Sequence, residues 1–374
     1  MIKYVIALKE LGIQNDKLIF LIKNYSTYII KMFNDKKVFE TEFELLIYQD
    51  YFADQAIVDE ALARAESILL KNKELKIKTT YYMAQSYPKE LEQIKNPPAI
   101  IYYKGAEFSE VSKYSIACVG TREPTRLSYR ATNYLIPQLV NVGCSIISGL
   151  ALGVDRLAHQ ACISSGGKTI AVLAHGLDIV YPEKNIDLSE RILQNGGIIM
   201  SEYPVGVRGN KYRFVNRNRL IVGMAKAVII CECSEKSGTM HNVEFARQQN
   251  KPIFCPQPDE KNFDVQSGTK LLIAKHIATV IKNGRDIAGV LKAVNVTISK
   301  SKMSSERIKE IFLHSMLVLT TNEQVIDAII QDLKLPLQRN QFLTKNLVEI
   351  IKENLVDMDE LLNSIIDNNI LIDK

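Results

Sequence analysis

A short apolar run that ends in a glycine turn, Ser115-Ile116-Ala117-Cys118-Val119-Gly120-Thr121-Arg122, marks the point at which the pattern of the chain changes. From here to about residue 291, β-rich apolar runs alternate with helical segments, which predicts a doubly wound parallel sheet. The expected strands lie at residues 115–119, 145–147, 169–173, 197–201, 227–233 and 252–254. Because ligands bind outside the carboxyl ends of the strands in such sheets, the loops after these strands should hold most of the chemistry.

The segments on either side of this region have a different character. Apolar residues recur at helical spacing up to about Lys78, which predicts a small helical unit over residues 1–80. The α/β domain is expected over 81–295, with a strand-like run after Pro97-Pro98 as its lead-in. A polar stretch then leads into a final unit at 306–374, which is predicted to be a short helical or winged-helix module.

Composition limits the class of protein. The 374 residues suggest two or three domains, and the hydrophobic fraction of 47% is typical of a globular chain. A formal net charge of +5 is small for this length, so an anionic polymer would be bound through a local patch. The six cysteines form no CxxC pair and most lie in apolar runs, which favours buried, reduced thiols. The early charge at Lys3 and the lack of a long apolar run predict a cytoplasmic protein without a membrane segment.

The segment from Arg208 to Arg219 is the densest basic and aromatic cluster of the sequence. It carries five cations together with Tyr212 and Phe214, and it precedes an apolar run. Such a cluster points to a nucleic acid or a nucleotide. Arg217-Asn218-Arg219 would diverge by about 100° per residue on a helix, so one or two should contact ligand while another braces the loop. Phe214 is either a stacking platform for single-stranded nucleic acid or an anchor for the loop.

Three further loops are candidates for anion contact. Gly120-Thr121-Arg122 offers backbone amides and a cation, or is simply a tight turn, and its glycine pattern is not GxGxxG. Ser148-Gly149 begins a loop that runs to Asp155, in which the glycines allow close backbone approach or tight packing, and Asp155 caps the following helix or orients a neighbouring amide. Ser237-Gly238-Thr239 opens a helix and forms a second anion site. Asn185 lies in a polar loop at the same edge.

Catalytic and metal-binding patterns are weak. His175 follows the third strand, but no serine or cysteine in an elbow motif needs it as a base. Cys231-x-Cys233 has no further ligand in register for a metal. We therefore expect no catalytic residue, no metal and no cofactor.

Eight motifs in order resemble the DNA-processing protein A (DprA/Smf) family over roughly residues 87–291. The resemblance implies an extended Rossmann-like domain that binds single-stranded DNA, forms a homodimer and loads RecA recombinase in natural transformation. It also implies a SAM-like fold for the N-terminal unit and a divergent winged helix at the C-terminus. The motifs are Tyr87-Pro88, Pro97-Pro98, Gly120-Thr121-Arg122, Ser148-Gly149-x-Ala151-x-Gly153-x-Asp155, Tyr181-Pro182-x-x-Asn185, Ser201-Glu202, Phe214-x-x-Arg217-Asn218-Arg219 and Ser237-Gly238-Thr239.

Carried over by position, the resemblance assigns Arg122 to DNA phosphate and Lys211 with Phe214 to the strand-binding pocket. The full predicted DNA-binding set is Gly120, Thr121, Arg122, Ser148, Gly149, Asn185, Lys211, Phe214, Arg217, Asn218, Arg219, Ser237, Gly238 and Thr239. A competing hypothesis is a nucleotide-binding sensor or a LOG-like phosphoribohydrolase of the wider superfamily, because Ser237-Gly238-Thr239 followed by Glu244 faintly resembles the loop of those enzymes. That loop lacks their first glycines here, and the cations extend beyond one nucleotide, which favours a polymer.

Overall fold

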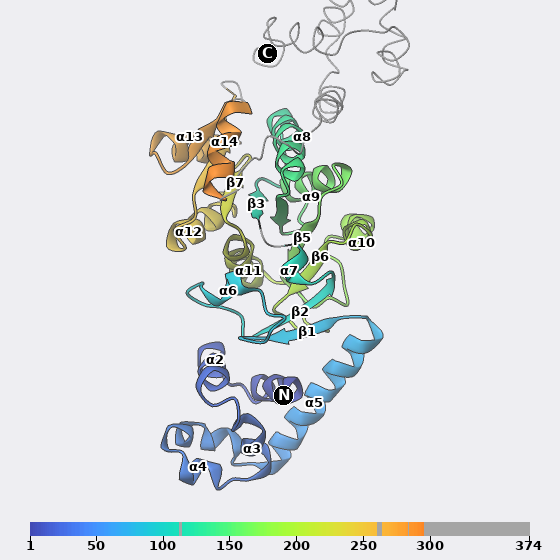
Figure 1. Ribbon diagram of the computed structural model, residues 1–374, viewed down its shortest axis with the longest axis vertical. Helices are drawn as coiled ribbons and strands as arrows, with labels where there is room; N and C mark the ends of the chain where they lie inside the picture. Colours follow the sequence, from blue (N-terminus) through green and yellow to red (C-terminus); the bar gives the residue numbers. More distant parts are fainter. Residues whose placement is uncertain (112–113, 260–263, 283, 295–374) are drawn as a thin grey trace, which may run out of the picture.

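The computed structural model describes residues 1–111, 114–259, 264–282 and 284–294. The predicted C-terminal unit at 306–374 lies outside the described residues. Within them, a nine-stranded sheet lies between flanking helices, with a group of helices from the N-terminal part of the chain at one end (Figure 1). The prediction of a Rossmann-like α/β domain is confirmed.

Seven strands of the sheet are parallel, in the order β6-β5-β4-β3-β7-β8-β9. They are short and largely buried because both faces are covered by helices. The chain works outward from β3 in one direction and then returns to β7 on its other side, so the strand order reverses between β3 and β7. Their bounds are β3 Ser115–Val119, β4 Ser145–Ser148, β5 Thr169–Leu173, β6 Ile198–Ser201, β7 Ala227–Ile230, β8 Ile253–Pro256 and β9 Thr279–Ile281.

The sheet is mixed, since two antiparallel strands extend its β6 edge. β2 (Ile100–Gly105) pairs with β6, and β1 (Lys78–Tyr81) pairs with β2. The strand-like run after Pro97-Pro98 is thus β2, whereas β1 and β9 were not predicted. β1 reads Lys-Thr-Thr-Tyr and lies at an edge, so it lacks the apolar run that marks a central strand.

Helices cover the two faces of the sheet in separate groups. Apolar residues of α11, α12 and α13 pack on one face, and those of α8, α9 and α14 pack on the other. The remaining helices occupy the connections. Bounds in the domain are α6 Lys89–Glu92, α7 Phe108–Val111, α8 Arg126–Asn141, α9 Val154–Ser164, η2 Glu183–Asn185, α10 Ile186–Gln194, α11 Lys211–Met224, α12 Met240–Gln248, α13 Ser267–Ala274 and α14 Gly284–Ala293.

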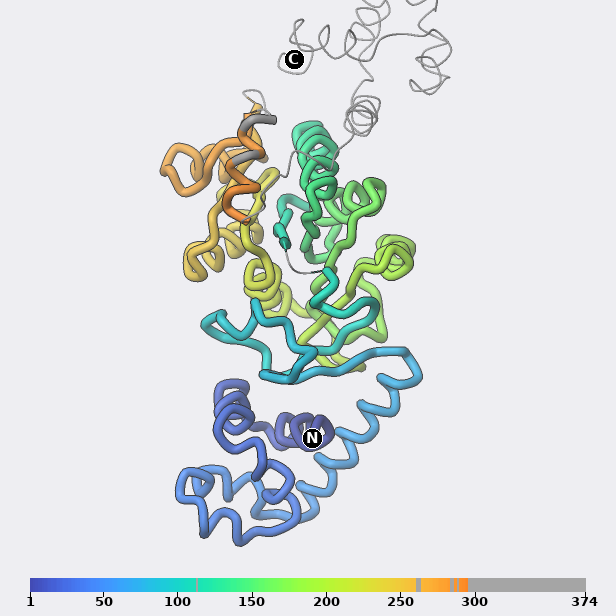
Figure 2. The backbone as a smooth tube through the Cα atoms, viewed as in Figure 1, coloured from blue at the N-terminus to red at the C-terminus, as the bar shows by residue number. Residues whose placement is uncertain are grey.

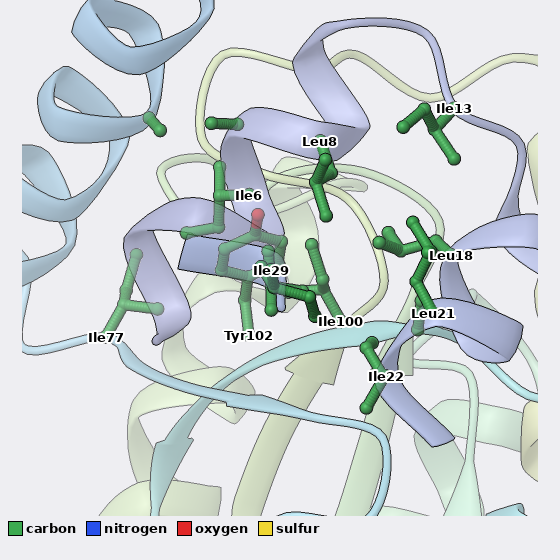
Figure 3. Close-up of a cluster of buried hydrophobic side chains, with 14 of the residues drawn as sticks. Ile6, Leu8, Ile13, Leu18, Leu21, Ile22, Ile29, Ile77, Ile100 and Tyr102 are labelled. Carbon is green, nitrogen blue, oxygen red and sulfur yellow. The ribbon is translucent and has the colours of Figure 1, made fainter. Parts of the chain in front are cut away.

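The N-terminal helices pack on the antiparallel end of the sheet (Figure 2). Ile6 and Leu8 share a buried cluster with Ile100 and Tyr102 of β2, which Figure 3 shows in close-up. The helical unit and the α/β domain therefore share a hydrophobic core. The bounds are α1 Ile2–Glu10, α2 Asn15–Asn24, α3 Ile29–Asn34, α4 Val38–Thr41, η1 Phe43–Phe52 and α5 Gln55–Glu74.

All six cysteines are buried free thiols, as the apolar context of most of them suggests. Cys118 and Cys231 lie on neighbouring strand ends with their sulfur atoms 3.5 Å apart. Among the described residues, no helix combines the length and the apolar character needed to cross a bilayer.

Candidate nucleic-acid interface

Two of the predicted anion loops meet where the strand order reverses. Gly120-Thr121-Arg122 follows β3, and Ser237-Gly238-Thr239 precedes α12 after the neighbouring strand β7. Thr239 Oγ1 donates a hydrogen bond to the Gly120 carbonyl over 2.9 Å, and the Thr239 amide donates to Ser237 Oγ over 3.1 Å. The switch point of an open α/β sheet is where its ligands bind, and these bonds fix the two loops side by side there.

Glu232, which was not predicted from the sequence, stabilises this junction through hydrogen bonds. Its backbone carbonyl accepts from the Thr121 amide over 2.7 Å. Its carboxylate accepts from the Thr125 amide and hydroxyl, Ser128 Oγ and Gln266 Nε2 over 2.6–3.0 Å. A fully buried carboxylate is tolerated because its oxygens are so well satisfied. The only signal in the sequence is an acidic residue set between two cysteines in an apolar run.

The loop after β4, which we call the floor loop, is buried at Gly149 and Leu150 and half-buried from Ala151 to Gly153. Ser148 Oγ donates to the Cys118 carbonyl over 2.7 Å, while the Gly149 and Ala151 amides donate to the Asp155 carboxylate over 3.0 and 3.4 Å. Burial raises the pKa of Asp155, and the nearby Arg217 opposes that rise. Of the two roles proposed for Asp155, the geometry gives it the one of orienting neighbouring amides.

Asn185 lies with the same loop. Its Nδ2 donates to the carbonyls of Leu150 and Ala151 over 2.8 and 3.2 Å, and its Oδ1 accepts from Arg156 over 2.8 Å. The side chain is completely buried. Its observed contacts are therefore those of a residue that shapes the β4–α9 loop.

Arg217 lies beneath the floor loop. Its guanidinium donates to the Gly149 carbonyl over 2.8 Å and to the Val172 carbonyl of β5. A Cβ atom on Gly149 would lie 2.5 Å from that guanidinium, so a larger residue there would displace Arg217 from its present position. Burial lowers the pKa of Arg217 to about 10, and only 5% of the residue is exposed. The adjacent Asn218 is also buried and accepts from Arg217 Nε over 3.1 Å.

Arg219 is held in a second buried arrangement. Both terminal nitrogens donate to the Glu202 carboxylate, over 2.6 and 2.9 Å, so α11 is tied to the end of β6. The three consecutive residues 217–219 therefore diverge as helix geometry requires, and all three are directed into the protein.

The side chains that reach the surface form a different group. Arg122 lies over the ring of Phe214, with 5.9 Å between its guanidinium carbon and the ring centroid. On the same ring, Tyr181 packs at 5.8 Å between centroids. Lys211 is exposed at the first residue of α11, where Asn210 caps the helix by accepting from the Arg213 amide. We name Arg122, Tyr181, Lys211 and Phe214 the surface group.

Tyr181 was not among the predicted site residues. It was quoted only as part of the Tyr181-Pro182 motif in the polar loop after β5. Its aromatic ring is exposed beside Phe214, which makes a two-ring surface next to a cation. Its aromatic type in a loop at the carboxyl edge was the available signal.

The predicted residues thus divide into two layers. Gly120, Thr121, Arg122, Phe214 and the 237–239 loop lie around the switch point, with Lys211 at the start of the helix that carries Phe214. Ser148, Gly149, Asn185, Arg217, Asn218 and Arg219 lie underneath and position them. An exposed cation beside an aromatic face suits a phosphate next to a stacked base.

The metal and catalytic patterns weighed in the sequence can be located in the described part of the chain. There, no cluster of three or more histidine, cysteine or acidic residues could hold a metal ion. His175 is buried, with Nδ1 2.9 Å from the Gly176 carbonyl, and burial lowers its pKa. Through this contact, His175 helps to shape the loop that follows β5.

The fold and the converging loops define a Rossmann-like α/β protein with its ligand loops at the switch point of the sheet. The model of the family described as DNA recombination-mediator protein A matches residues 78–292, more than half of the chain. The chain belongs to this family.

Curated relatives agree with this assignment. Protein Smf of Synechocystis sp. is 41% identical over 171 residues, which cover 45% of this chain and 43% of that protein. DNA processing protein DprA of Bacillus subtilis is 31% identical over 240 residues, 64% of this chain and 80% of that protein. The match thus spans less than half of the Synechocystis relative.

Two solved structures share the fold. That of DNA processing protein A from Streptococcus pneumoniae has a TM-score of 0.62 and 24% identity, covering 77% of this chain and 98% of that one. That from Helicobacter pylori, described for its single-stranded DNA binding mode, has a TM-score of 0.52 and 33% identity, covering 58% of this chain and 96% of that one.

Proposed function

We propose that this protein binds single-stranded DNA at the switch-point loops and acts as a recombination mediator. The observation that carries the proposal is the contact between Arg122, from the loop after β3, and Phe214, from α11. It pairs a cation for a phosphate with a ring for a base, and Lys211 adds a second exposed cation on the helix that carries Phe214. The related Helicobacter pylori protein, described for its single-stranded DNA binding mode, gives independent support.

The wider role is part of the same proposal, and family membership supports it. The protein acts in the cytoplasm as a homodimer, protects incoming single-stranded DNA and loads RecA recombinase onto it during natural transformation. It works by binding, without catalysis of its own. In support of this last point, the buried groups His175, Asp155 and Glu232 are engaged in internal hydrogen bonds.

Salt-dependent binding of a fluorescent single-stranded oligonucleotide tests the site. The logarithm of the affinity should fall with the logarithm of the salt concentration, with a slope of about −0.7 per phosphate contacted. Arg122→Ala and Lys211→Ala should each weaken binding and flatten the slope by roughly 0.7, because each removes one cation. Phe214→Ala should lose roughly 1–3 kcal/mol of binding free energy with the slope almost unchanged.

Matched controls lie on the N-terminal unit. Lys36→Ala removes an exposed cation and Phe43→Ala an exposed aromatic ring, and both should bind like the unmodified protein. If the three site variants behave like these controls, the site is wrong. Release of a free base from a nucleoside monophosphate would instead support the phosphoribohydrolase alternative.

A further inference from the structure

A cleft of about 590 Å³ lies between the N-terminal unit and the α/β domain. The start of α2 forms one side and residues 94–96 the second, while α11 and α12 form the third. Its volume falls within the roughly 300–1,000 Å³ that small-molecule sites occupy. None of the residues of the surface group lines it, so it is distinct from the switch-point site.

The lining is dominated by primary amides. Six of its eleven residues are asparagine or glutamine, namely Gln14, Asn15, Asn96, Asn216, Gln248 and Gln249. Each such side chain carries donor and acceptor groups, although those of Asn15 are already bonded to Asn96, Pro97 and Ala99. The charged residues of the lining have both signs, since Asp16 lies there with Lys95 and Arg219. A site for phosphate alone would be dominated by cations, so the lining suits a ligand whose own edge alternates donors and acceptors.

Two buried atoms at the cleft lack a partner among the described residues. These are the Nε of Arg219, a donor, and the Oε1 of Gln249, an acceptor. Both belong to one junction, since Gln249 Nε2 donates to the Arg219 carbonyl over 3.1 Å. Only 5% of Arg219 is exposed, and both of its terminal nitrogens donate hydrogen bonds to Glu202. Buried polar groups are normally paired, but both atoms lie below the surface, so a ligand in the cleft would contact the exposed amides of Asn96 and Gln248 and not these two atoms.

Phe245 completes the site. It is half-buried on α12 and lines the cleft among the amides. Amide side chains that pair with base edges and an aromatic ring that stacks on a base together recognise a nucleobase. Lys95, which is exposed at the cleft, can meet the attached phosphate.

We propose that this cleft binds a nucleotide through its base. This nucleotide comes from one of two sources: it is either part of the bound DNA strand or a free mononucleotide. The first source rests on the proposed function, because α11 carries Phe214 of the switch-point site and Asn216 of the cleft only two residues apart. The second source does not depend on it.

Two variants block the cleft in different ways. Asn96→Trp fills it from an exposed position and leaves Asn15 its other hydrogen bonds, to Pro97 and Ala99. Gln248→Ala removes an exposed amide on α12 without touching the junction between Gln249 and Arg219. The matched control is Gln194→Ala, an exposed amide at the end of α10. Circular dichroism verifies that each variant is folded.

The probes are adenosine 5′-monophosphate, followed by titration calorimetry, and a fluorescent single-stranded oligonucleotide of mixed sequence. If the source is free, the mononucleotide binds saturably to the unmodified protein and to Phe214→Ala, and Asn96→Trp weakens it roughly tenfold or more. If the source is the strand, both cleft variants weaken oligonucleotide binding about fivefold or more, with the salt slope unchanged because no cation is lost.

The proposal is overturned if both cleft variants bind both probes as the unmodified protein and Gln194→Ala do. Failure of the proposed function has a different signature. In that case the unmodified protein does not bind the oligonucleotide, or Arg122→Ala and Phe214→Ala bind it normally. The experiment with the mononucleotide still shows whether the cleft binds a nucleotide.

Discussion

At the scale of single residues, the hydrogen bonds of His159 define its protonation state. His159 lies on α9 and is completely buried. Thr169 Oγ1 donates to the Ile146 carbonyl over 2.7 Å, so its contact with His159 Nδ1 at 2.8 Å requires the imidazole to donate. Nε2 has no partner among the described residues. The ring is therefore neutral, and burial lowers its pKa from 6.5 to about 3.

This depressed pKa makes stability depend on pH. Below pH 6.5, His159 becomes protonated in the unfolded chain, whereas in the folded protein it stays neutral down to about pH 3. Acidification therefore favours unfolding. Between pH 7 and pH 5 the unfolding free energy should fall by about 2 kcal/mol more for the unmodified protein than for His159→Gln. Urea unfolding at several pH values measures the difference.

The control for this measurement is His241→Gln, an exposed histidine on α12. It should keep the pH dependence of the unmodified protein. Unfolding free energies of His159→Gln that run parallel to those of the unmodified protein across this range would contradict the assignment.

Residue roles could be predicted only in part from the sequence. Helix geometry predicts that Arg217, Asn218 and Arg219 diverge, and the polar carboxyl edge predicts that Arg122 and the 237–239 loop lie together. The sequence does not predict that Arg217 and Arg219 are both buried. That depends on Glu202, which pairs with Arg219, and on Asp155, whose charge favours the Arg217 cation, and both are brought near the arginines only by the tertiary fold. Glu232 was missed for the same reason, because its partners span residues 121 to 266.

At the scale of elements, α11 connects the surface group to the core. Its first turns carry Lys211 and Phe214, and its last turns are wholly buried. The ion pair between Arg219 and Glu202 fixes it to the end of β6, with 6% and 13% of the two side chains exposed. The position of Phe214 therefore depends on a contact within the protein.

We expect Glu202→Gln to destabilise the protein by about 3–5 kcal/mol, because it leaves the Arg219 cation buried without its counter-ion. The double variant Glu202→Gln/Arg219→Met should recover part of that loss, since no unpaired charge remains. Chemical denaturation of the single and double variants gives the coupling free energy. The exposed pair Arg64–Glu60 on α5 is the matched control, and Glu60→Gln should cost no more than about 0.5 kcal/mol. Equal costs at the two sites would contradict the role given to Glu202.

Elements were predictable where burial was complete. The six predicted strands appear because parallel strands covered on both faces show as apolar runs. β7 is shorter than expected, since residues 231–233 continue as buried backbone after the strand ends at Ile230. β9 has an exposed residue and a half-exposed one among its three, so its sequence gives no such signal.

At the scale of the whole molecule, the N-terminal unit and the α/β domain are joined by polar contacts as well as by a shared core. Asn15 at the start of α2 donates to the Pro97 carbonyl over 2.6 Å and accepts from the Ala99 amide over 2.8 Å. These bonds satisfy the backbone just before β2, whose Ile100 and Tyr102 pack against α1 and α2 residues. The predicted boundary near residue 80 falls within β1, so the sheet itself begins where the helices end.

The two units should therefore unfold together, with Asn15 as part of the link. Asn15→Ala removes both bonds and leaves two partly buried backbone groups without these partners, which should cost about 1–3 kcal/mol. Hydrogen exchange followed by mass spectrometry should show faster exchange in α1 and in β2 alike, because both depend on one cooperative opening. Asn24→Ala on the same helix is the control, since its amide donates to the Phe20 carbonyl at the surface. Faster exchange confined to α1, with β2 unchanged, would mean that the units open independently despite their common core.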